Sequence, residues 1–102
     1  MSVKAQIDIP GRRLAEFCGL HHIRRLSLFG SVLREDFRAE SDVDVLVEFE
    51  KGQPVGLIGL ARMERELSAL LGRKVDMNTA GFISPDYRDE VLKEAEVLYV
   101  AP

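Results

Sequence analysis

The chain has 102 residues, of which 46% are hydrophobic and 30% are charged, as is ordinary for a globular protein. Its net charge of −3 and its pI of about 5.4 argue against a DNA-coating protein, so no direct DNA binding is expected. No apolar run approaches the ~18 residues of a membrane span, and the N-terminus lacks a signal-peptide core. From the length, we expect one domain over residues 1–102. The single cysteine excludes an internal disulfide, and we expect the protein in the reducing cytoplasm.

The first predicted element is a helix over about residues 10–20, because proline is favoured in a first helical turn. The apolar residues that recur at helical spacing are Leu14, Phe17 and Cys18. Cysteine is usually buried, so this spacing predicts that the Cys18 thiol lies in the core. His21 and His22 fall in the connection that follows. His22 could approach a substrate phosphate, but it is interpreted as a solvated loop residue. Two adjacent histidines without a third partner are a weak metal signal.

A short buried strand is predicted next, over residues 26–29, and it ends at Gly30-Ser31. Residues 32–37 are expected to form one or two helical turns. Valines alternate with other residues from position 43 to 48, and this period of two predicts a second strand. The span from the first strand to the second is too short for an ordinary parallel crossover, so an antiparallel or mixed pairing is expected.

The second half of the chain predicts a helix, a strand, a helix and a strand. Apolar residues at helical spacing mark one face of a helix over residues 57–71, which Gly72 ends. A strand over residues 74–78 follows, then a helix beginning at Ser84-Pro85-Asp86, then a strand over residues 97–100. The apolar side of the third helix is assigned to Val91, Leu92 and Ala95. The expected fold class is therefore α/β, a mixed sheet of about four strands packed with helices.

Side chains on these helices are interpreted without a functional role. Glu64 and Glu66 are expected on an exposed helix face. Tyr87 and Tyr99 are expected to pack against the core rather than to accept a transferred group.

Asp42 and Asp44 are the first candidates for chemistry. Side chains at positions i and i+2 of a strand point to the same face, with Cα atoms ~6–7 Å apart. Two carboxylates at that spacing repel each other unless a cation lies between them, and Mg²⁺ is commonly held by one or two carboxylates and substrate phosphates. The alternative is that both acids are simply solvated.

Gly30-Ser31 is the second candidate, at the junction of a strand and a short helix. Glycine allows a sharp turn and a close backbone approach to a ligand, and N–H groups at a helix start can bind an anion. A Gly-Ser pair alone is usually only a turn. Ten residues separate this pair from Asp42 and Asp44, and the combination suggests a phosphate cradle beside a metal pair. Asp76 is the candidate third acid, because it is flanked by strand-like residues.

This order of Gly-Ser, ten residues and Asp-x-Asp resembles the signature of the DNA polymerase beta-like nucleotidyltransferase superfamily. The match is to its minimal nucleotidyltransferase (MNT, MntA-like) family and covers nearly the whole chain, including LFGSVLRED, SDVDVLVEFE, LGRKVDMNT and RDEVLKEAEVLYV. The resemblance implies that Gly30 and Ser31 bind the nucleotide phosphates. Arg34 matches a basic residue usual after the turn, and either contacts phosphate or pairs with Glu35 or Asp36.

By the same resemblance, Asp42, Asp44 and Asp76 are the catalytic residues and the metal ligands, with two Mg²⁺ ions and ATP as substrate. The family also implies a partner, a small helical HEPN-domain toxin of RNase type. The MNT protein would be its antitoxin and would transfer AMP from ATP to a toxin tyrosine. The chain has no added helical domain, so a partner in a homo- or hetero-oligomer could supply the acceptor surface.

Two other functions remain open at the level of the sequence. The protein could neutralise its partner by binding alone, or it could transfer a nucleotide to a small molecule. The presence of Gly30, Ser31, Asp42, Asp44 and Asp76 together favours an enzyme, and the absence of a second domain counts against a small-molecule transferase.

Overall fold

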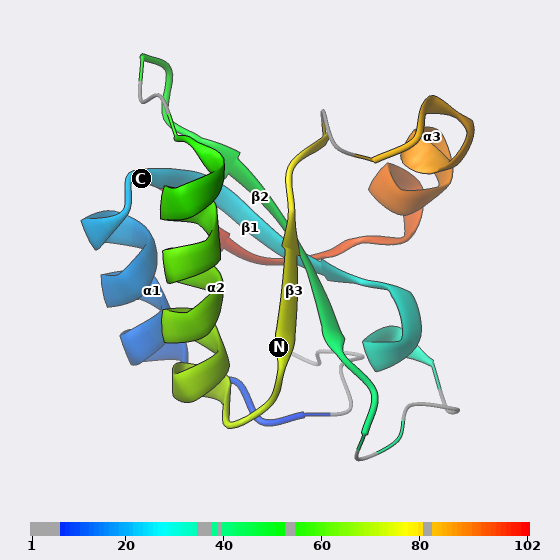
Figure 1. The fold of residues 1–102 in the computed structure, drawn as a ribbon, viewed down its shortest axis with the longest axis horizontal. Helices are drawn as coiled ribbons and strands as arrows, with labels where there is room; N and C mark the ends of the chain where they lie inside the picture. The colour runs from blue at the N-terminus through cyan, green and yellow to red at the C-terminus, as the bar shows by residue number, and fades with distance from the viewer. Residues whose placement is uncertain (1–6, 35–37, 39, 53–54, 81–82) are drawn as a thin grey trace.

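A four-stranded mixed sheet with two helices packed on one face organises the protein in its computed structural model (Figure 1). The structure describes residues 7–34, 38, 40–52, 55–80 and 83–102. The elements in chain order are α1 (Gly11–Leu20), β1 (Ile23–Phe29), the 3₁₀ helix η1 (Gly30–Leu33), β2 (Val43–Phe49), α2 (Leu57–Leu71), β3 (Val75–Asn78), α3 (Pro85–Glu94) and β4 (Glu96–Val100). The predicted α/β class with a mixed sheet is confirmed.

The strand order is β3-β2-β1-β4. Strand β1 is antiparallel to both β2 and β4, whereas β2 and β3 are parallel. The antiparallel pairing expected for the first two strands is therefore confirmed. Because β3 and β4 are the two edges, β3 has a strand neighbour on one side only.

The core lies between the sheet and the layer formed by α1 and α2. Val43, Val45 and Val47 are at most 1% exposed, and Cys18 is fully buried, as predicted. Since side chains alternate along a strand, Asp44 and Glu48 of β2 point to the opposite face. The helices thus cover the valine face and leave the aspartate face to the site.

Strand β1 begins at Ile23, three residues earlier than predicted. The prediction left out two arginines that lie inside the strand. Arg24 and Arg25 are exposed, and Arg24 Nη2 lies 3.1 Å from Glu48 Oε1 on the neighbouring strand. An ion pair across the sheet thus accommodates charged residues that the sequence suggested were outside the strand.

The short helix expected over residues 32–37 is wrong in its position. A 3₁₀ helix occupies Gly30–Leu33 and ends at Arg34, whose backbone is extended. A positive φ of 76° at Gly30 starts this turn directly at the end of β1. Residues 35–37 lie outside the described part of the chain, and so does the alternative in which Arg34 pairs with Glu35 or Asp36.

Helix α3 lies away from the α1–α2 layer, and none of its residues is buried (Figure 1). Leu92 and Tyr87 are 50% and 63% exposed, so the packing roles predicted for them are wrong. Leu57, at the first turn of α2, is likewise 71% exposed. Tyr99 packs against the core, as predicted. Apolar spacing alone therefore did not identify which side chains meet the sheet.

The two histidines differ in environment. His22 is exposed, with Nδ1 3.4 Å from Glu50 Oε2. His21 instead packs its ring against Phe17, with centroids 4.7 Å apart, and its Nε2 lies 3.2 Å from Glu66 Oε2. The solvated loop residue predicted at His22 is confirmed. Within the described residues, no helix is long and apolar enough to cross a membrane.

Candidate active site

Gly30 lies against Asp44 at the end of β1. Phe29, the residue before it, is the cross-strand partner of Asp44. A Cβ atom at position 30 would collide with Asp44 Oδ2 and would lie 3.2 Å from its Cγ. The position therefore needs glycine twice, for its positive φ and for the close approach. The sheet brings the Gly-Ser turn and the aspartate strand together, as the sequence predicted.

Ser31 is half-buried in the first turn of η1. Its carbonyl oxygen accepts a hydrogen bond from the Arg34 N–H at 2.9 Å. This bond closes the turn that follows Gly30. Gly30, Ser31 and Arg34 are thus part of one short, tight segment beside Asp44.

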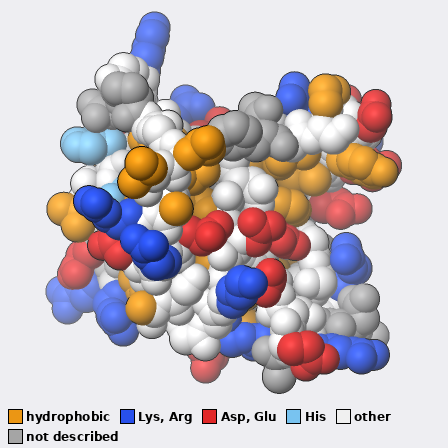
Figure 2. Space-filling model, viewed as in Figure 1, with side chains coloured by type: hydrophobic (Ala, Val, Ile, Leu, Met, Phe, Trp, Pro, Cys, Tyr) orange, Lys and Arg blue, Asp and Glu red, His pale blue; other side chains and the backbone are white. Residues whose placement is uncertain are grey.

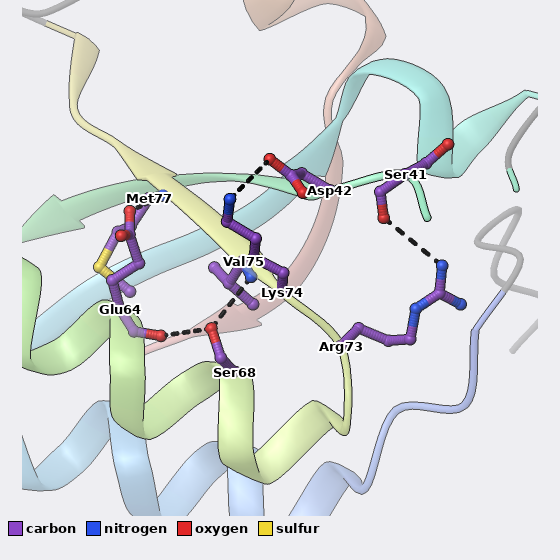
Figure 3. A network of polar contacts seen from close by, with 8 residues as sticks. All are labelled: Ser41, Asp42, Glu64, Ser68, Arg73, Lys74, Val75 and Met77. Carbon is purple, nitrogen blue, oxygen red and sulfur yellow. Dashed lines mark hydrogen bonds and ion pairs between the residues drawn. The ribbon is translucent and has the colours of Figure 1, made fainter. Parts of the chain in front are cut away.

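The parallel pairing of β2 and β3 places Asp44 and Asp76 opposite each other in register. Asp42, two residues before Asp44, lies directly before β2. Its Oδ2 lies 3.9 Å from Lys74 Nζ (Figure 3). The Val43 N–H donates to the Lys74 carbonyl at 2.8 Å. The three predicted acids therefore come from β2, from β3 and from the residue just before β2.

The carboxylates act on one another electrostatically. Burial, and then the nearby charges of Asp76 and Asp42, raise the pKa of Asp44, whereas Arg34 lowers it. An ionised Asp44 is therefore costly in the protein alone. Figure 2 shows acidic side chains gathered near the middle of one face, with basic side chains beside them.

The oxygen-rich donor set fits a hard divalent cation such as Mg²⁺. Across the described residues, no three His, Cys, Asp or Glu side chains are arranged to hold a metal ion by themselves. Mg²⁺ usually takes one or two carboxylates and completes its shell with substrate phosphates and water. The residues therefore fit a cation that arrives with a phosphate-bearing substrate.

A cleft of about 400 Å³ opens beside the Gly-Ser turn. Its lining residues are Gly30, Leu33, Arg34, Lys93 and Glu94. Lys93 belongs to the last turn of α3, and no local sequence pattern associates it with a turn some sixty residues earlier. Arg34 and Lys93 give this cleft two cationic side chains suited to an anionic ligand.

Sequence reasoning also missed polar side chains that support the acid-bearing strands. Arg73 Nη2 donates to the Arg38 carbonyl at 2.7 Å, and so ties the turn after α2 to the segment before Asp42. Glu64, expected on an exposed face, instead accepts a hydrogen bond from the Met77 N–H at 2.8 Å (Figure 3). These contacts link distant segments, and no local pattern predicts them.

Known proteins resemble this chain in sequence. The family model described as "Nucleotidyltransferase domain" matches residues 12–98. A candidate protein adenylyltransferase of Methanocaldococcus jannaschii, MJ0435, is 41% identical over 75 residues, covering 74% of this chain and 78% of the relative. The protein adenylyltransferase MntA of Thermococcus cleftensis is 36% identical over 78 residues, covering 76% of this chain and 75% of the relative.

Solved structures give the same fold. A candidate minimal nucleotidyltransferase, 38% identical, has a TM-score of 0.68 and covers 82% of this chain and 84% of its own. A toxin–antitoxin structure with AMP-PNP has a TM-score of 0.73 at 17% identity, covering 91% of this chain and 75% of that one. A chain from a complex of the tri-AMPylated Shewanella oneidensis HEPN toxin with MNT antitoxin has a TM-score of 0.65 at 17% identity, covering 89% and 70%.

The last two likenesses show the fold alone, whereas the family match and the closer relatives also show kinship. The family and the enzyme class predicted from the sequence are confirmed. The chain belongs to the nucleotidyltransferase domain family, among its minimal, MntA-like members.

Proposed function

We propose that this protein is a Mg²⁺-dependent adenylyltransferase that moves AMP from ATP to a tyrosine hydroxyl of a HEPN-type toxin, and so acts as its antitoxin. The observation that carries the proposal is the convergence of Asp42, Asp44 and Asp76 beside Gly30. The relatives named as protein adenylyltransferases support the transferred group. The structural likeness to toxin–antitoxin chains supports the class of partner.

The phosphates of ATP would be held at the Gly-Ser turn. Gly30 lies against Asp44, so a phosphate bound by the N–H groups of this turn would lie near that carboxylate. Arg34 and Lys93 line the adjoining cleft and would neutralise phosphate charge. These residues orient the α-phosphate toward the acid-bearing strands.

Asp42, Asp44 and Asp76 would hold two Mg²⁺ ions, which when bound offset the negative charge of the phosphates and of the carboxylates. In the transfer, the acceptor hydroxyl oxygen bonds to the α-phosphorus of ATP. The bond from that phosphorus to the bridging oxygen breaks, and pyrophosphate leaves. Asp76 lies on the exposed edge strand, where its carboxylate can receive the hydroxyl proton.

The acceptor would come from outside the chain. Nothing else in the described structure adds a substrate-holding domain to the sheet and its three α-helices. A HEPN partner would supply that surface in a hetero-oligomer, and we propose that residues 1–102 form one catalytic domain within it. The ATP requirement is consistent with the cytoplasmic location that the sequence predicts.

The test is to incubate the pure protein with Mg²⁺, ATP and the HEPN-type protein encoded beside it, and to weigh the intact partner. A gain of one or more AMP units, mapped to tyrosine by fragmentation, is expected. Asp42→Asn and Asp44→Asn should abolish the gain while circular dichroism shows a retained fold. Glu48→Gln, on the same face of β2, is the matched control and should stay active.

Two results would contradict the proposal. Full activity in both aspartate variants would show that these carboxylates are not catalytic. A tight complex without any mass gain would show that neutralisation works by binding alone.

A further inference from the structure

Two hydrogen bonds join helix α2 to the strand that carries Asp76 (Figure 3). Glu64 Oε2 accepts from the Met77 N–H at 2.8 Å, and Ser68 Oγ accepts from the Val75 N–H at 3.0 Å. The two N–H groups belong to the residues on either side of Asp76. The helix therefore holds the backbone of β3 immediately before and after the third acid.

The spacing of the two elements makes this double contact possible. Glu64 and Ser68 are four residues apart, about 6 Å along one helix face. Val75 and Met77 are two residues apart, about 6.6 Å along a strand, and their N–H groups point to the same side. The earlier helix residue bonds the later strand residue, as the antiparallel run of α2 and β3 requires.

These N–H groups lie on the outer side of the sheet. Strand β3 is an edge of only four residues and pairs with β2 alone. An uncovered edge presents unpaired donors and is free to shift or to pair with other chains. Glu64 and Ser68 take the place of a further strand at this edge.

The acceptors are themselves fixed. Both side chains are partly buried, and the Ser68 hydroxyl donates to the Glu64 carbonyl at 2.7 Å. A carboxylate that accepts from a backbone N–H forms a stronger bond than a neutral acceptor does. The pair is therefore a partly buried, hydrogen-bonded support rather than an exposed surface contact.

We propose that Glu64 and Ser68 are positioning residues for the transfer reaction, which set the place of Asp76 opposite Asp44 through the Val75 and Met77 N–H groups. This inference rests on the proposed function, in which Asp76 receives the proton of the acceptor hydroxyl. Loss of either acceptor frees β3 and misplaces one acid. The Gly-Ser turn follows β1, which β2 separates from β3, and should keep its geometry.

The experiment compares Glu64→Ala, Glu64→Gln and the control Glu66→Ala, each at saturating partner. Glu66 is on the same helix, but its carboxylate lies near His21 rather than β3. Glu64→Ala is expected to lower kcat about 10- to 100-fold with little change in KM for ATP, since small misplacements of reacting groups have effects of that size. Glu64→Gln keeps an acceptor and should recover most of the rate. Ser68→Ala and Ser68→Thr form a second pair with the same expectation.

A second readout is independent of activity. Amide hydrogen exchange followed by NMR should become faster at Met77 in Glu64→Ala and at Val75 in Ser68→Ala, with the rest of the sheet protected. Unchanged exchange at these amides would overturn the inference, whether or not the wild-type protein transfers AMP. If the variants exchange faster but the wild-type protein transfers no AMP, the proposed function is overturned and the structural support of β3 by Glu64 and Ser68 stands.

The kinetic result has its own contradiction. A kcat for Glu64→Ala equal to that of wild type, per folded molecule, would mean that the contact only stabilises the fold. A Glu64→Gln variant as slow as Glu64→Ala would show that charge, and not the hydrogen bond to β3, is what matters.

Discussion

Gly30 and Asp44 approach so closely that position 30 has no room for a Cβ atom. The contact joins the end of β1 to the strand of the paired aspartates. The same glycine has a φ of +76°, which L-residues rarely adopt. A backbone demand and a steric demand therefore coincide at the point where the phosphate-binding turn meets the carboxylates.

Gly30→Ala should inactivate the enzyme, while Gly52→Ala should not. Each substitution forces alanine into a positive φ, at a cost of about 1–2 kcal/mol in the free energy of unfolding. Only at position 30 does the new methyl also meet a carboxylate, because nothing lies within 4 Å of a Cβ at Gly52. Chemical denaturation and AMP-transfer rates should show stability losses in both and a rate loss of about 100-fold in Gly30→Ala alone. Equal activity in the two variants would contradict this assignment.

Mg²⁺ should raise the melting temperature of the wild-type protein and not that of Asp44→Asn. Burial and the charges of Asp76 and Asp42 raise the pKa of Asp44, so its ionised form destabilises the fold near neutral pH. A cation that binds only the folded state relieves this repulsion and stabilises it. Without Mg²⁺, Asp44→Asn should therefore melt above wild type. Differential scanning fluorimetry with and without Mg²⁺ measures both effects.

The control for this measurement is Glu48→Gln, on the same strand and face. Glu48 is paired with Arg24 and Arg25, and not with the aspartates. Its Mg²⁺-induced shift should equal that of wild type. Equal shifts in wild type and Asp44→Asn would place the cation elsewhere.

The Cys18 thiol should contribute a pH-dependent stability that disappears at high pH. Burial raises the pKa of Cys18 to about 12, from 9.0 in the unfolded chain. The contribution is complete below pH 9 and is lost as the pH rises toward 12, because the unfolded state then releases the proton first. The difference in unfolding free energy between wild type and Cys18→Ala should fall by about 1.4 kcal/mol per pH unit above pH 9. A difference that stays constant from pH 8 to 11 would show that the thiol is accessible.

Local sequence pattern predicted much of the fold and the centre of the site. The period of two in β2 separated the buried valines from the aspartates, and both the strand and its faces are as expected. Gly72 ends α2 in the left-handed conformation that its position suggested. The Gly-Ser turn and the two aspartates were placed together because they flank one short connection. Each of these features depends on residues that are close together in the chain, so it can be predicted from the sequence alone.

The parts that the sequence did not reveal depend on tertiary contact. Spacing in α3 suggested a buried face, yet α3 has no buried residue, since periodicity does not say what a helix packs against. Glu64 looked like an exposed acid, and its bond to the Met77 N–H follows only from the pairing of α2 with an edge strand. Lys93 enters the cleft because β4 returns the chain beside β1.

Lys93 should contribute to ATP binding rather than to the chemical step. It lines the cleft with Gly30 and Arg34, and its helix leads into β4, which β1 separates from the aspartates' strands. Lys93→Ala should raise KM for ATP about 3- to 10-fold, which corresponds to about 0.7–1.4 kcal/mol, with kcat nearly unchanged. Lys93→Arg keeps the charge and should stay near wild type.

Lys51→Ala is the matched control, because Lys51 follows β2 at the opposite end of the sheet from the Phe29–Asp44 pair. Steady-state kinetics at two salt concentrations tests this prediction. Salt screens a contact between Lys93 and phosphate, so the difference in KM between wild type and Lys93→Ala should shrink at high salt. The Lys51→Ala variant should match wild type at both concentrations. A fall in kcat at unchanged KM would show instead that Lys93 acts on the transition state.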